Sequence, residues 1–134
     1  MQTVELATES VVDVITTIEQ VGPCGQRNID MLTAESVACD TASDVRLIIA
    51  ELATNAFEHG SAPAVSIGLT IDDDGVAIRM TYIDAGTAPD PNDAVMPPPT
   101  SLRGRGLALV AALASTVERT EIDGVTVTVV TLAR

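Results

Sequence analysis

The chain has 134 residues, 46% of them hydrophobic and 19% charged, which suits one globular domain with its own core and is too short for two. Its formal net charge is −12, and all seven cations are arginines. Phe57 and Tyr82 are the only aromatic residues. An acidic surface without aromatic stacking platforms argues against direct binding of nucleic acid. We therefore expect a single domain, residues 1–134, with an aliphatic core.

The cysteines and the N-terminus carry no signal for metal binding or export. Cys24 and Cys39 are isolated, with no CxxC pair, so a structural zinc site is not expected. The first residues, MQTVELATESVVDVITT, contain acids but no Lys or Arg, unlike a secretory signal. No apolar run approaches the roughly 20 residues that cross a bilayer. We therefore expect a reduced, cytoplasmic protein that does not enter a membrane.

The N-terminal segment predicts a strand and then a helix. Residues 4 to 21 suggest a short edge strand, TVEL, followed by the helix ESVVDVITTIEQV, which ends at Gly22-Pro23. Residues 24 to 40 are mixed in character and predict no definite element.

A long helix is predicted between Thr41 and Gly60. Thr41 is a good N-cap, and Asp44, three residues later, gives an acidic variant of the capping box. Gly60 ends the helix where a left-handed residue is wanted. The apolar residues between them follow helical spacing: Val45, Ile48, Ile49, Leu52, Ala53 and Ala56.

The rest of the chain predicts two hairpins separated by a loop and a helix. AVSIGLTI (64–71) and VAIRMTYI (76–83) alternate and flank the turn DDDG. A loop or lid is predicted at about 85–104, since residues 85–101 hold five of the seven prolines. GLALVAALASTV (106–117) predicts a helix, and RTEI-DG-VTVTVVTLA a second hairpin. This order predicts a two-layer α/β sandwich whose mixed, mainly antiparallel sheet is covered on one face by helices.

One face of the long helix carries polar residues. Glu51, Asn55 and His59 are four residues apart, so their side chains stack. Glu51 and Asn55 lie at the edge of the apolar row, where the helix would meet a cleft. A carboxylate there can accept a proton, and an amide oxygen can ligate a cation such as Mg²⁺. Alone, the pattern also fits the solvated side of an amphipathic helix.

The stretch YIDAGT places Asp84 and Gly86 where a strand enters a loop. The carboxylate of Asp84 could accept a hydrogen bond from an exocyclic amine such as that of adenine. Gly86 allows close approach of the backbone to a ligand. An ordinary Asp-x-Gly turn has the same sequence.

The stretch LRGRGLALV places Gly104 and Gly106 just before a helix. Free N–H groups and the positive helix end make an anion site there. Arg103 and Arg105 add charge suited to phosphate. A single Gly-x-Gly before a helix is common, so this motif gains meaning only together with the others.

In this order the motifs resemble those of the GHKL ATPase superfamily, which includes the ATP-binding part of gyrase and the ATPase domains of histidine kinases. ELATNAFEH resembles its N box, DAG the start of its G1 box, and GRGLALV its G2 box. The short chain and the form of the N box are most similar to the stand-alone anti-sigma-factor serine kinases. The resemblance covers the chain from about residue 41 to the C-terminus.

The resemblance implies that the domain binds ATP and Mg²⁺. Glu51 would be the general base toward a hydroxyl or water, and Asn55 would ligate Mg²⁺. Asp84 would hold the adenine amino group, and Gly86 would let the base pack against the backbone. The residues implied to bind ATP through the G2 box are Arg103, Gly104, Arg105, Gly106 and Leu107.

Two positions depart from the family pattern. Ala88, followed by Pro89, stands where family members usually have a second G1-box glycine. The Gly-Thr often seen in the late strand is Gly124-Val125 here, so no ligand-binding threonine is assigned. His59 fits the N box, but we interpret it as structural at the helix end.

The resemblance implies an ATP-dependent serine/threonine kinase that acts as an anti-sigma factor. It would phosphorylate a STAS-type anti-anti-sigma protein and sequester a sigma factor. Ala88 and the proline-rich lid motivate an alternative, a degenerate GHKL module that sequesters a partner protein without kinase activity. The ATPase part of a histidine kinase ranks last, because His59 is the only histidine. The chain could also form a homodimer.

Overall fold

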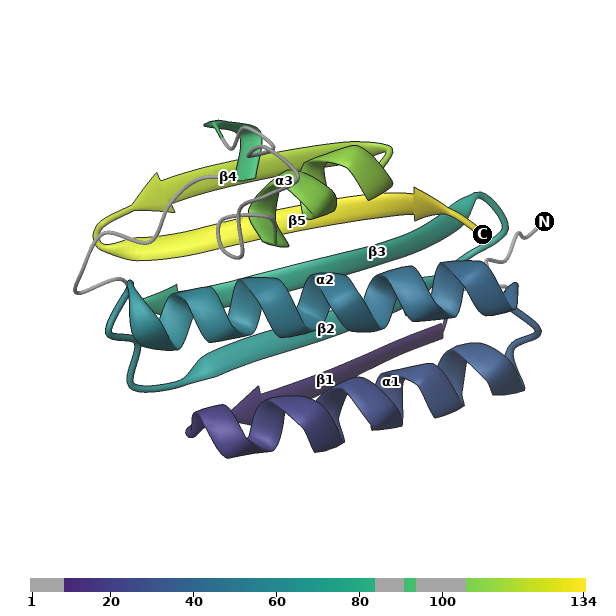
Figure 1. The fold of residues 1–134 in the computed structure, drawn as a ribbon, viewed down its shortest axis with the longest axis horizontal. Coiled ribbons are helices and arrows are strands. Elements are labelled where there is room, and N and C mark those ends of the chain that lie inside the picture. The colour runs from purple at the N-terminus through teal and green to yellow at the C-terminus, as the bar shows by residue number, and fades with distance from the viewer. Residues whose placement is uncertain (1–8, 84–90, 94–105) are drawn as a thin grey trace, which may run out of the picture.

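The computed structural model describes residues 9–83, 91–93 and 106–134, which form a two-layer α/β sandwich (Figure 1). Three helices lie on one face of a five-stranded sheet with the order β1-β2-β3-β5-β4. The four described strand pairings are all antiparallel, so the predicted fold class is confirmed. The strands are β1 (Glu9–Ile15), β2 (Val65–Ile71), β3 (Gly75–Ile83), β4 (Thr116–Ile122) and β5 (Val125–Ala133). The helices are α1 (Val21–Ala34), α2 (Cys39–Glu58) and α3 (Gly106–Leu113), with short 3₁₀ turns η1 (Ile18–Gln20) and η2 (Pro91–Asp93).

The core lies between the sheet and α2. Every second residue of β2 and β3 is buried, starting at Val65 and Val76, because alternate side chains of a strand point to the same face. Helix α2 contacts these two strands, and the predicted apolar row is its buried side. Helices α1 and α3 both contact α2 and lie on its two sides (Figure 1). The core is mainly aliphatic, as the composition predicts, and also contains Cys24, Met80 and Tyr82.

The predicted N-terminal helix is wrong, because Glu9–Ile15 form the edge strand β1, which pairs with β2. This segment is rich in valine and isoleucine, which favour strands. Ile15 is buried whereas Val12 and Val14 are exposed, which is consistent with alternation at a period of two. The predicted strand TVEL lies outside the described residues.

Helix α1 begins where the sequence predicts a helix end. Gly22-Pro23 lies in the first turn of α1, which continues to Ala34 through residues that predicted no definite element. Proline is tolerated in a first turn because its missing N–H would have had no partner within the helix.

Helix α2 is confirmed, but it begins earlier than predicted. Its first residue is Cys39, so Thr41 lies inside the helix and is not its N-cap. The Thr41 hydroxyl donates a hydrogen bond to the Ala133 carbonyl oxygen at 3.4 Å. The predicted capping box of Thr41 and Asp44 is therefore wrong, and the tertiary contact with β5 replaces it.

The C-terminal end of α2 is close to the predicted one. The helix ends at Glu58, and the backbone N–H of His59 donates to the Asn55 carbonyl oxygen at 2.9 Å. The residue with a left-handed backbone is Ser61, with φ of 51°. Gly60 does not have a positive φ, so its predicted role is wrong.

Both predicted hairpins are present. In the first turn the Asp72 carboxylate accepts hydrogen bonds from the backbone N–H groups of Asp74 and Gly75. Helix α3 ends at Leu113, before the predicted residue 117, because the chain from Thr116 onward pairs with β5 as strand β4. Within the described ranges, no helix combines the length and the apolar character that a membrane span requires.

Candidate functional site

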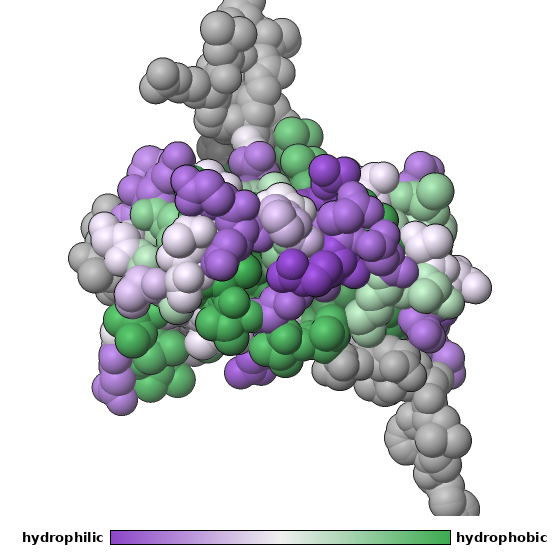
Figure 2. All heavy atoms as spheres, turned by 90° about the horizontal axis from the view of Figure 1, so that it is seen from below, coloured by the Kyte–Doolittle hydropathy of each residue, from purple (hydrophilic) through white to green (hydrophobic). Residues whose placement is uncertain are grey.

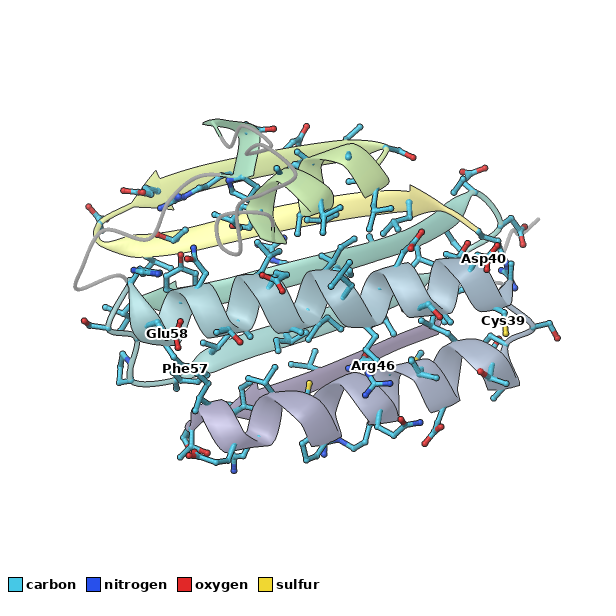
Figure 3. All side chains as sticks on the ribbon, in the orientation of Figure 1. Cys39, Asp40, Arg46, Phe57 and Glu58 are labelled. Atoms are coloured by element: carbon cyan, nitrogen blue, oxygen red, sulfur yellow. The ribbon has the colours of Figure 1, made fainter. Side chains whose placement is uncertain are left out.

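Glu51 and Asn55 lie one turn apart on α2, at the edge of its buried row. Both are half-buried, whereas Glu58 and His59 at the end of the helix are exposed (Figure 3 labels Glu58). In the part of the chain that the structure describes, no side-chain hydrogen bond or ion pair engages the Glu51 carboxylate or the Asn55 amide. Polar groups beside a core that have no partner among the described residues are suited to bind a ligand.

The first residue of α3 contacts Glu51 directly. A Cβ atom placed on Gly106 would overlap Oε1 and Cδ of Glu51 and would lie 3.1 Å from its Cγ. Gly106 does not have a positive φ, so the close approach, and not an unusual backbone, is what requires glycine. Two motifs far apart in the sequence therefore meet at this point.

This contact places the N-terminus of α3 beside the Glu51 carboxylate. The first N–H groups of a helix lack partners within the helix and carry the positive end of its dipole. The first turn of α3 holds no acidic residue. Leu107 is half-buried and packs against the core, so it anchors the helix start. A carboxylate that can accept a proton and the positive end of a helix thus lie side by side.

Thr126 is a candidate site residue that the sequence analysis does not assign. It is fully buried on the helix-facing side of β5 and pairs in register with Tyr82 near the end of β3. Its hydroxyl is buried, and no hydrogen-bond partner for it occurs among the described residues. A buried hydroxyl without a partner costs about 1–3 kcal/mol, so we expect a ligand to supply the partner. In the sequence, the predicted adenine-binding residue Asp84 comes directly after β3.

The Gly-Thr pair often seen in the late strand of the family does not identify this threonine, because here Val125 stands between Gly124 and Thr126. Strand alternation is the signal that could have found it. Thr126 shares a side of β5 with Val130 and Leu132, which are buried. A threonine in the buried row of a strand needs a hydrogen-bond partner.

Arg119 on β4 is a second polar residue on this side of the sheet. It pairs in register with Thr128 and faces the helices. Its side chain is only 8% exposed, and its Nη2 lies 2.9 Å from the Glu121 carboxylate. A largely buried cation therefore lies on the strand next to the one that carries Thr126.

Several predicted site residues lie outside the described residues and stay predictions. They are Asp84, Gly86, Arg103, Gly104 and Arg105, together with Ala88 of the G1 box. In the described part of the lid, the side-chain amide of Asn92 donates to the Val117 carbonyl oxygen at 3.1 Å. This bond ties η2 to strand β4.

The residues present suit a magnesium ion carried by a phosphate ligand. In the described ranges, no group of three or more His, Cys, Asp or Glu side chains could hold a metal by itself. Asn55 offers one amide oxygen. Mg²⁺ commonly takes one or two protein ligands and completes its shell with substrate phosphates and water. The unpartnered Thr126 hydroxyl and the glycine contact at Gly106 also fit a nucleotide.

A separate hollow of about 300 Å³ lies at the other end of the sheet. Its lining includes Asp72 and Asp74 of the β2–β3 turn and Ala133 at the end of β5. Thr126 lies at the opposite end of β5. This hollow is therefore not part of the site around Glu51.

Comparison with known proteins bears on the family and the fold of the chain. Residues 15–133 match the family described as the histidine kinase-like ATPase domain. The fold is similar to that in the crystal structure of the RsbU and RsbW domains of Rv1364c from Mycobacterium tuberculosis, with a TM-score of 0.66. The identity is 19%, and the match covers 92% of this chain and 32% of that one, so this chain spans about a third of its length. A search of functionally curated proteins finds no significant match.

Proposed function

The chain belongs to the histidine kinase-like ATPase domain family, and we propose that it is an ATP- and Mg²⁺-dependent protein serine/threonine kinase that acts as an anti-sigma factor. Membership of this family confirms the GHKL resemblance. The observation that carries the proposal is the contact of Gly106 with Glu51. It joins the start of α3 to the helix that carries the proposed base and the proposed magnesium ligand.

Each described residue would have a distinct role in the reaction. Bound Mg-ATP would supply the phosphoryl group. Asn55 would give Mg²⁺ an amide oxygen, and the first N–H groups of α3 would donate to phosphate oxygens. Thr126 would hydrogen-bond at the adenine end, near the strand that leads to Asp84. Glu51 would accept the proton of the attacking serine hydroxyl.

The proposed partners are a sigma factor and a STAS-type anti-anti-sigma protein in the cytoplasm. The motif resemblance supports this choice. The net charge of −12 supports it as well, because an acidic protein is complementary to a partner with a basic, DNA-facing surface.

Calorimetric titration with ATP, with and without Mg²⁺, tests the nucleotide site. The native chain should bind ATP more tightly with Mg²⁺, and Asn55→Ala should remove most of that gain, roughly tenfold in affinity. Thr54→Ala, at the neighbouring position on α2, is the control and should keep the gain in ATP affinity that Mg²⁺ gives. If Asn55→Ala keeps the full effect of Mg²⁺, Asn55 is not the metal ligand.

Transfer of labelled γ-phosphate to the STAS-domain proteins of the same genome tests the kinase activity. Glu51→Gln should keep ATP binding and lower the transfer rate by about 100-fold or more, the usual contribution of a general base. Glu58→Gln changes an exposed carboxylate on the same helix and should transfer at the native rate. If the native chain binds ATP but phosphorylates none of these proteins, the kinase proposal is wrong.

The alternative, a module that sequesters a partner without chemistry, is favoured by Ala88 in the G1 box. The Glu51→Gln variant separates the two proposals. A kinase needs Glu51 to release its partner by phosphorylation, so the variant should hold its partner permanently. If the variant captures and releases its partner as the native chain does, the module is the correct description.

A further inference from the structure

Strand β1 forms one edge of the sheet, and its outer side has no partner in the part of the chain that the structure describes. The sheet order β1-β2-β3-β5-β4 gives β1 a neighbouring strand on one side only. In an antiparallel edge strand, every second residue directs its N–H and C=O groups outward. Among the described residues, no hydrogen bond beyond those to β2 engages the backbone of Glu9–Ile15. These outward groups can therefore pair with a further strand.

Exposed apolar side chains gather on the same strand. Four of the six large hydrophobic residues that are exposed in the described structure lie on β1 or just after it: Val11 (37%), Val12 (64%), Val14 (65%) and Ile18 (38%). Val11 lies on the helix-facing side with the buried Ile15, and Val12 and Val14 lie on the other side. Figure 2 views this edge, which lies low in Figure 1, and shows hydrophobic surface along the margin opposite the mainly hydrophilic helices. A gathering of this kind marks an interaction site.

The opposite edge of the sheet, β4, is protected in ways that β1 is not. Three of the seven residues of β4 are charged, and they occur on both sides of the strand. The Val117 carbonyl oxygen accepts a hydrogen bond from the side chain of Asn92 at 3.1 Å. Charged residues and occupied backbone groups keep an edge strand from pairing with another chain. In β1 the central charge, Asp13, is instead paired with Arg27 at 3.2 Å.

The surroundings of the β1 edge are acidic. Residues 9–34, which span β1, η1 and α1, include four acids and one arginine. The Asp13 carboxylate lies on the helix-facing side of β1, where it accepts hydrogen bonds from Arg27 and from the Cys24 thiol. A carboxylate has about four acceptor sites, so a donor on an adjacent strand could bind it as well. Basic side chains on that side of an added strand would therefore be complementary to this edge.

We propose that the outer edge of β1 binds an extended segment of a partner protein in which apolar and basic residues alternate. The segment would add a sixth strand to the five-stranded sheet through backbone hydrogen bonds. Its apolar side chains would pack beside Val12 and Val14, and its basic side chains would lie beside Asp13. Strands β2 and β3 separate this edge from Thr126 on β5, so the inference does not depend on ATP binding.

Fluorescence anisotropy with a labelled synthetic peptide, GSKVRVKVSG, tests the proposal on the full chain at about 0.15 M salt. The peptide alternates valine with lysine and arginine, as the proposed segment does. The native chain should bind it with a Kd below about 1 mM. A peptide of the same composition without the alternation, GSVVVKRKSG, should bind about tenfold more weakly or less. The same loss is expected for GSEVEVEVSG, in which glutamate replaces each basic residue.

Val12→Lys and Ile122→Lys are a matched pair of variants. Val12 and Ile122 are 64% and 66% exposed, and they lie on the same side of the sheet but on its two opposite edges. Each variant adds one positive charge, so both have the same net charge. Val12→Lys should lower peptide affinity about tenfold or more, because it removes an apolar contact and repels the basic peptide. Ile122→Lys should bind nearly as the native chain does, and thermal unfolding confirms that both variants are folded.

Hydrogen exchange of the native chain locates the bound peptide without any substitution. The backbone amides of β1 should exchange more slowly when the peptide is present, because hydrogen-bonded amides are protected. The amides of β4 should exchange at the same rate with and without the peptide.

Any of four results would overturn the proposal. The native chain could fail to bind the alternating peptide, or bind the non-alternating peptide equally well. The two lysine variants could lose the same affinity, which would assign the effect to net charge. Finally, the β1 amides of the chain alone could become protected as its concentration rises, which would assign the edge to a second copy of the chain.

Discussion

The two faces of the sheet are built from the same alternating strands but are suited to different partners. On the helix-facing side, aliphatic residues form the core, and the Thr126 hydroxyl is buried without a partner in the described structure. On the open face, which points away from the helices, β5 presents three valines, and the strands beside it present one arginine and one glutamate among threonine and isoleucine residues. A buried polar group without a partner indicates a small ligand, whereas an exposed neutral surface indicates another protein. The predictions below test this difference.

The largest effect is expected from Gly106→Ala, on the helix-facing side. The new Cβ would overlap the end of the Glu51 side chain, which can move, so the carboxylate rather than the fold should be displaced. Phosphoryl transfer should fall about 100-fold, a usual consequence of a misplaced catalytic group. The melting temperature should change by no more than a few degrees, because alanine favours a helix over glycine by about 1 kcal/mol.

Gly22→Ala is the matched control for that experiment. Gly22 is also in the first turn of a helix, but a Cβ there would meet nothing within 4 Å. This variant should transfer phosphate at the native rate. Equal loss of activity in both variants, or none in either, would remove the argument that Gly106 positions Glu51.

An intermediate effect is expected from Thr126→Val, with opposite signs for stability and binding. Removing a buried hydroxyl that has no partner should raise the unfolding free energy of the nucleotide-free protein by about 1 kcal/mol. ATP affinity should fall roughly tenfold, because the hydrogen bond to the ligand is lost. Urea unfolding and calorimetry measure the two quantities.

Thr128→Val provides the comparison for Thr126→Val. Thr128 is also buried on the same side of β5, but it lies two residues further from the end of β3 that leads to Asp84. The Thr128→Val variant should therefore leave ATP affinity unchanged. A Thr126→Val protein that is less stable and binds ATP normally would show that the hydroxyl serves the fold and not a ligand.

The smallest effect is expected from Cys24, where α1 meets β1. Burial, and then the nearby charge of Asp13, raise the pKa of the Cys24 thiol from 9.0 to about 11. The thiol of the unfolded chain therefore ionises first as the pH rises. The protonated Cys24 thiol therefore contributes fully to the unfolding free energy below pH 9. Between pH 9 and 11 that contribution is lost, so the unfolding free energy should be lower by about 1 kcal/mol at pH 10.

Urea unfolding of the native chain and of Cys24→Ala, from pH 8 to pH 10.5, measures that loss. The difference in unfolding free energy between the two proteins should shrink as the pH rises. A constant difference over this range would show that the environment of Cys24 does not resist ionisation.

The elements that the sequence predicts well are those whose patterns have one interpretation. The alternation in 64–71 and 76–83 and the long periodic row after Thr41 gave two strands and a helix close to those observed. For Glu9–Ile15 the predicted helix is wrong because a run of valines fits both a buried helix and an edge strand. Its pairing with β2, a contact between distant segments, is what selects the strand.

The same limit applies to the candidate site. Spacing along one helix was enough to place Glu51 and Asn55 together, because helical geometry is local. The glycine-helix motif predicted an anion site but gave no indication that Gly106 touches Glu51. The sequence does not identify Thr126 because its burial, and the lack of a partner for its hydroxyl among the described residues, depend on the helices that cover β5.

The sequence by itself determined the aliphatic core, the acidic surface, the order of most elements and the motifs of an ATPase domain, since each depends on composition or on neighbours along the chain. Only the tertiary structure decided that β1 is a strand, that α3 begins against Glu51, and that the open face presents Arg79 and Glu118 on either side of β5. These features depend on which distant segments pack together. Packing is fixed by burying the whole core at once, which no local pattern encodes.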